Sequence, residues 1–146
     1  IRPLTFMDRF AQGSAYSSRA ANVLACTVEN QPEHAWLMHS LLLNPNVQPE
    51  GEGPGHDNEM FVELADQLLG AASGELKNCI TNDKYVPFVG AINDWVFQYP
   101  VQGSVNNSVM VGGTPTVIVG GIEFTGDLLN TSSLRAFFIE NGIAID

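Results

Sequence analysis

Residues 109–126 of this chain read VMVGGTPTVIVGGIEFTG. Residues 116–119 are β-branched and favour a strand, residues 120–121 are a Gly-Gly turn, and residues 122–125 supply a return strand. Pro115 stands at the first position of this hairpin, where its missing N–H is tolerated. An ordinary trans proline is the simplest interpretation, because only about 5–6% of X–Pro bonds in folded proteins are cis.

Helical patterns fill most of the chain before the hairpin. Pro32 suits the first turn of one of these helices, and residues 85–99 form another in which Phe88 and Val89 pack inward. Gly70 is a plausible helix stop. Side chains that could cap helices are Ser17 or Ser18, Asp57, Ser73, and Thr131 or Ser132 for a last helix after the hairpin.

The first residues, Ile1 to Leu4, are interpreted as the end of a strand that began upstream. A long helical block between a strand and a hairpin predicts an α/β sandwich that carries a helical insertion. The length of 146 residues favours one domain.

Composition and charge argue against several classes of partner. The chain has 6 Lys and Arg against 16 Asp and Glu, a formal charge of −10, which repels nucleic acids and anionic membranes. No apolar run approaches the roughly 18–20 residues of a membrane helix. No G-x-S-x-G elbow, phosphate loop or dinucleotide fingerprint is present.

The two cysteines, Cys26 and Cys79, form no C-x-x-C motif. They could be buried thiols, a structural disulfide, a redox pair or metal ligands. A metal site is disfavoured, because His34 and His39 are five positions apart and do not share a helix face, and His56 lies in a loop. We favour a structural disulfide, which implies an oxidising compartment, with two separate buried thiols as the simplest alternative.

Several segments together resemble the DsbA-like thiol:disulfide oxidoreductases of the thioredoxin superfamily. They are GGTPTVIVGG, RPLTFMDRF, YSSRAANVLAC and KYVPFV, and the pattern is similar to the secreted DsbA-like proteins of actinobacteria. The resemblance implies a thioredoxin-like fold with an inserted helical subdomain and a cis Thr114–Pro115 bond. It also implies that Gly113, Thr114 and Pro115 hold the substrate beside a catalytic disulfide, and that Cys26 and Cys79 form a second, structural disulfide.

The family's catalytic C-x-x-C pair is absent from these residues. We therefore expect the first strand and the active-site helix to lie upstream of residue 1. The expected parts of this partial domain are a strand end and connection (1–16), the helical insertion (17–99), and the proline loop, hairpin and last helix (100–146). Without its first strand the sheet has a gap, so residues 1–4 would pair with residues 116–119, or the chain would self-associate.

The resemblance implies an extracytoplasmic enzyme that oxidises protein thiols by dithiol–disulfide exchange, without metal or organic cofactor. Reduced or unfolded proteins would be its substrates, and a membrane redox partner would reoxidise it. Two alternatives remain open. One is a redox-inactive peptide-binding or chaperone module of the same fold, and the other is a glutathione-transferase-like enzyme.

Overall fold

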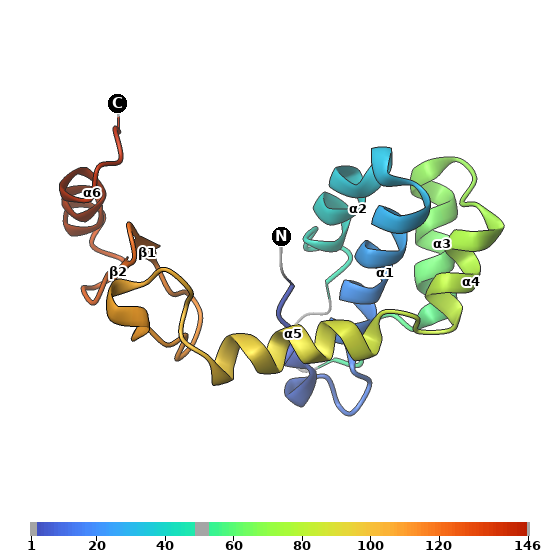
Figure 1. The fold of residues 1–146 in the computed structure, drawn as a ribbon. Helices are drawn as coiled ribbons and strands as arrows, with labels where there is room; N and C mark the ends of the chain where they lie inside the picture. Colours follow the sequence, from blue (N-terminus) through green and yellow to red (C-terminus); the bar gives the residue numbers. More distant parts are fainter. Residues whose placement is uncertain (1–2, 49–52, 146) are drawn as a thin grey trace. The chain divides into compact units, whose positions relative to one another are not determined.

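A computed structural model describes residues 3–48 and 53–145 of the chain (Figure 1). The chain divides into two compact units, Ile1–Asn93 and Asp94–Asp146. The division falls within helix α5 (Val86–Gln98), before the boundary predicted after residue 99. We describe each unit by itself and call them the helical unit and the hairpin unit.

The helical unit is built around helix α1 (Tyr16–Asn30), which contacts α2 and α4 directly (Figure 1). The other elements are the 3₁₀ helices η1 (Phe6–Phe10) and η2 (Pro32–His34), the helices α2 (Ala35–Leu42), α3 (Asn58–Leu69) and α4 (Gly74–Thr81), and the first part of α5. No helix among the described residues is both long and apolar enough to cross a bilayer.

The core of this unit lies where α1, α2, α3 and α4 meet. Its largest fully buried side chains include Phe61, Met38, Leu76 and Ile80. Burying side chains of this size stabilises a fold by about 1.5–3 kcal/mol each. The helical unit therefore has a hydrophobic core of its own.

Three predicted helix signals are confirmed. Asp57 accepts a hydrogen bond from the Met60 amide at 2.9 Å, and Ser73 caps α4 in the same way. Gly70 ends α3 in the left-handed region, with φ of +73°. Each signal depends only on residues a few positions apart.

Two predicted caps are wrong. Helix α1 begins at Tyr16, and the Asp8 carboxylate accepts from both the amide and the hydroxyl of Ser18. Ser18 is thus a donor to a cap on a neighbouring element rather than the cap itself. The last helix, α6 (Thr131–Glu140), is capped by Asn130 in place of Thr131 or Ser132.

The hairpin unit contains the end of α5, η3 (Val105–Asn107), strands β1 (Ile118–Val119) and β2 (Ile122–Glu123), and α6. The predicted hairpin is confirmed, with Val119 opposite Ile122 in an antiparallel pair. Gly120 and Gly121 both have positive φ, +59° and +84°, as a tight two-residue turn requires.

The described residues combine mostly helical structure with one two-stranded sheet, which is a mixed α/β composition. The predicted opening strand is wrong for Pro3 and Leu4, while Ile1 and Arg2 lie outside the described residues. The Thr5 amide instead donates to Asn93 Oδ1 at 3.0 Å, and the Thr5 carbonyl accepts from the first turn of η1. Thr5 is therefore tied to helices on both sides.

Apolar side chains are poorly covered within the hairpin unit. None of its described apolar residues, 94–145, is fully buried, and Leu129 is 89% exposed. The Phe124 and Phe137 rings lie 5.2 Å apart between centroids and hold α6 to the hairpin. This unit is organised by its turn, its caps and a few ring contacts.

Candidate functional site

The segment predicted to hold substrate, Gly113 to Pro115, is exposed to solvent. The Thr114–Pro115 peptide bond is cis, as the resemblance implies. The hydroxyl of Thr116 donates to the Gly113 carbonyl at 2.6 Å and holds the segment in a turn. A partner can therefore reach the backbone of this loop without displacing protein side chains.

Strand β1 continues directly from this loop. The Val117 carbonyl accepts from the Phe124 amide at 2.9 Å, so β1 is paired with β2 along one edge. No other strand of the described residues joins this sheet. An extended peptide could use the outer edge of β1, because unpaired strand backbone is a ready template for pairing.

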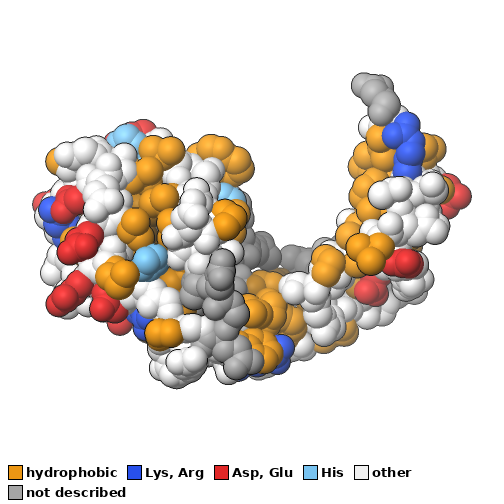
Figure 2. Space-filling model, turned by 180° about the vertical axis from the view of Figure 1, so that it is seen from behind, with side chains coloured by type: hydrophobic (Ala, Val, Ile, Leu, Met, Phe, Trp, Pro, Cys, Tyr) orange, Lys and Arg blue, Asp and Glu red, His pale blue; other side chains and the backbone are white. Residues whose placement is uncertain are grey.

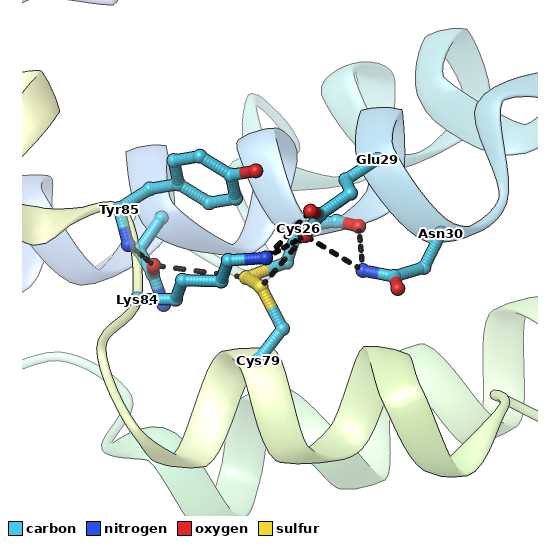
Figure 3. Close-up of polar contacts among 7 residues, drawn as sticks. Cys26, Glu29, Asn30, Cys79, Lys84 and Tyr85 are labelled. Atoms are coloured by element: carbon cyan, nitrogen blue, oxygen red, sulfur yellow. Dashed lines mark hydrogen bonds and ion pairs between the residues drawn. A yellow bond between two sulfur atoms is a disulfide. The ribbon is translucent and has the colours of Figure 1, made fainter.

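The predicted disulfide between Cys26 and Cys79 is confirmed. It joins α1 to α4 across 53 positions of sequence, with the two Cα atoms 5.7 Å apart (Figure 3). Cys26 is fully buried and Cys79 is 5% exposed. Since these are the chain's two cysteines, neither one is a metal ligand or a free thiol here.

An ion pair lies over this disulfide (Figure 3). The Lys84 ammonium donates to both carboxylate oxygens of Glu29, at 2.5 and 2.7 Å, and one of these oxygens lies 3.8 Å from the Cys79 sulfur. The hydrogen bond from Lys84 lowers the pKa of Glu29, and the hydrogen bond to Glu29 raises the pKa of Lys84.

The burial of the two cysteines has a chemical consequence for the disulfide. Thiol–disulfide exchange begins when a thiolate anion attacks a sulfur atom, and a buried sulfur atom is closed to that attack. The burial of both residues therefore favours a lasting structural bond between Cys26 and Cys79 over a reactive one.

Asn22 is fully buried beside the disulfide and was not singled out by the sequence. Its side-chain oxygen accepts from the Tyr85 amide at 2.7 Å, and its side-chain nitrogen donates to the Ile80 carbonyl at 3.4 Å. One amide thus links α1 to both α4 and the start of α5. A buried asparagine on a helix has no local pattern that would reveal this role.

The helical unit also contains an apolar groove of about 860 Å³. We call it the α1/α5 groove, and its walls come from α1, η2, α2 and α5. Its lining residues are Pro3, Ala21, Leu24, Ala25, Val28, Glu29, Pro32, Glu33, Ala35, Trp36, His39, Tyr85, Phe88, Val89 and Ile92.

The α1/α5 groove explains a wrong core prediction. Phe88 was expected to pack inward, but it is 57% exposed at the groove, whereas its neighbour Val89 is buried. Trp36 is 70% exposed at the same groove. An amphipathic pattern identifies an apolar helix face, but it does not say whether the rest of the chain covers that face.

The histidines gather no metal site among residues 3–48 and 53–145. His34 Nε2 lies 3.7 Å from Glu33 Oε1, and the His39 ring stacks on the Trp36 ring with centroids 5.2 Å apart. His56 lies near the Tyr16 and Phe61 rings instead. The three side chains thus belong to separate surroundings.

No protein-family model, no curated protein and no solved structure matches this chain.

Proposed function

We propose that this chain is the substrate-binding part of an extracytoplasmic, DsbA-like thiol:disulfide oxidoreductase with a thioredoxin-like fold. The observation that carries the proposal is the exposed Gly113–Pro115 loop, which leads into a strand with an open edge. A substrate chain would lie extended along this loop and add to the sheet edge. The redox chemistry in this proposal is inferred from the resemblance of the surrounding segments to the DsbA-like proteins.

In this proposal the redox-active cysteine pair lies outside these 146 residues, because Cys26 and Cys79 are bonded to each other. A substrate thiolate attacks the catalytic disulfide, which breaks its S–S bond and forms a mixed disulfide. A second substrate thiolate then attacks the mixed disulfide. The substrate leaves oxidised, and its two electrons leave the catalytic dithiol for a membrane redox partner.

A redox-inactive peptide-binding module is the second candidate. It is favoured by the exposed loop and the strand edge, which can bind a peptide whether or not a redox-active cysteine pair lies beside them. Both candidates bind peptides along the same loop and strand edge, residues 113–119. They differ in whether the natural protein removes thiols from its substrate.

The experiment uses the natural protein with a reduced, unfolded test protein and measures the loss of substrate thiols. Loss of two thiols per turnover, with a trapped mixed disulfide, supports the oxidoreductase. Binding without thiol loss supports the second candidate. When peptide is added, the changes in the NMR chemical shifts of the backbone amides must cluster at residues 113–119. If no such changes appear there, both candidates are refuted.

A variant of Thr116 sharpens this test. Thr116→Val removes the hydroxyl that holds the Gly113 carbonyl, so we expect peptide binding to weaken about 2- to 10-fold. Thr81→Val is the matched control, because Thr81 is exposed at the end of α4 in the helical unit and has no part in the loop or the hairpin. Equal peptide affinity of the two variants would argue that the loop geometry does not serve binding.

A further inference from the structure

We propose that the α1/α5 groove receives an amphipathic helix of a partner protein, with apolar residues along one face and Lys or Arg beside it. This site is separate from the proposed peptide-binding loop, because its lining residues all belong to the helical unit. The inference therefore does not depend on the redox function.

The α1/α5 groove exposes more large apolar side chains side by side than ordinary protein surface does. Three of its large apolar side chains, Trp36, Phe88 and Val28, are 70%, 57% and 53% exposed. Contiguous exposed apolar residues on a soluble protein mark an interaction site, and tryptophan is enriched among residues that dominate binding energy. Figure 2 shows apolar side chains reaching the surface of the helical unit, with many acidic side chains gathered on its left side.

The exposed rim favours a macromolecular partner over a small molecule. The volume of about 860 Å³ lies within the range of small-molecule pockets, about 300–1,000 Å³, so volume alone does not decide. A small molecule that fills the cavity would touch Trp36 and Phe88, but these side chains are 70% and 57% exposed, and a larger partner would cover more of their surface. A partner that covers the rim as well buries more apolar area.

The walls of the groove favour a helix over an extended peptide. They are formed by helices, whose backbone groups are already hydrogen-bonded, and Pro3 has no N–H to donate. An extended peptide would therefore bring unpaired backbone N–H and C=O groups into an apolar site, which is costly. A helix satisfies its own backbone and lays its apolar face in the groove.

The charges of the groove favour a basic partner. Its lining includes two carboxylates, Glu29 and Glu33, and no Lys or Arg. Glu29 is paired with Lys84, so Glu33 is the carboxylate that a partner's cation can approach. The formal charge of −10 on the chain attracts a basic partner at longer range.

Tryptophan fluorescence provides the test. The chain has two tryptophans, so Trp95→Phe leaves Trp36 as the reporter at the groove. The probes are a helical Leu/Lys peptide, a Leu/Glu peptide with the same apolar face, and a scrambled Leu/Lys peptide. We expect the first to shift Trp36 emission to the blue, with an affinity that falls as salt rises, and the other two to bind more weakly.

Two variants locate the binding. Phe88→Ala should weaken the Leu/Lys peptide about tenfold or more, because it removes an exposed aromatic anchor without opening the core. Glu33→Gln should weaken it about 1.5- to 5-fold, and Glu63→Gln, an exposed change on α3, should leave it unchanged.

Several results would overturn the proposal. They are equal binding of the three peptides, an affinity unaffected by Phe88→Ala, and a Trp36 response only to lipid vesicles or a small apolar dye. The measurement is repeated on the natural protein. A Trp36 already shielded there from a soluble quencher would show that the protein itself fills the groove, and would also refute a partner helix.

Discussion

Removing the Cys26–Cys79 disulfide should cost the helical unit a large part of its stability. A disulfide restricts the unfolded chain, and the effect in the chain-entropy account grows from about 3 kcal/mol for a 15-residue loop to about 4.7 kcal/mol for a 100-residue loop. For the separation of 53 found here, the same relation gives about 4 kcal/mol. Small domains are stable by only about 5–15 kcal/mol in total.

The measurement is urea unfolding of the double variant Cys26→Ala/Cys79→Ala in a Trp95→Phe background. Trp36 then reports on the helical unit alone, which matters because a chain of two units need not unfold in one step. With slopes of about 1–3 kcal/mol per molar urea, a loss of about 4 kcal/mol lowers the midpoint by more than about 1 M.

Reductant provides the control. It should destabilise the parent protein toward the level of the double variant and leave the double variant unchanged, since that variant has no sulfur bond to break. A loss below about 1 kcal/mol would refute the reasoning, because α1 and α4 would then be held by packing alone.

Two further predictions concern single side chains in the helical unit. The folded-state pKa of Glu29 is lowered, so its contribution to stability is present above its ordinary pKa of 4.5 and is lost as pH falls through the lowered value. When the free energy of unfolding is measured at decreasing pH, Glu29→Gln should therefore lose less stability than the parent protein. The control variant Glu63→Gln should follow the parent. Gly55→Ala should lose at least about 1–2 kcal/mol in the same unfolding assay, because Gly55 has φ of +65° and an added Cβ would lie 2.2 Å from Cδ2 of Tyr16. Gly74→Ala is the control and should lose no stability, because a Cβ added there meets nothing within 4 Å.

Most of the features that the residue pattern predicted correctly are local ones. The hairpin follows from β-branched residues around Gly120 and Gly121, and the α3 cap follows from Asp57, three positions before the amide it binds. Asp8, in contrast, caps α1 from a separate 3₁₀ helix ten positions away from Ser18. A contact of that kind depends on how two elements pack, so no short motif announces it.

The candidate sites divide in the same way. The cis Thr114–Pro115 bond and the pairing of Cys26 with Cys79 are confirmed, and both were expected from the resemblance in sequence. The α1/α5 groove could not be predicted, since periodicity places Phe88 and Val89 on an apolar helix face whether or not anything covers it. Only the packed structure separates the buried residue from the exposed one.

The small number of buried apolar side chains in the hairpin unit has a consequence for its local unfolding. A segment with little apolar surface withheld from water opens at low free energy, so its backbone amides exchange quickly with solvent. Limited proteolysis should therefore reach residues 94–145 first. The product that survives should be the cross-linked helices around Phe61, still joined between α1 and α4 by the bond from Cys26.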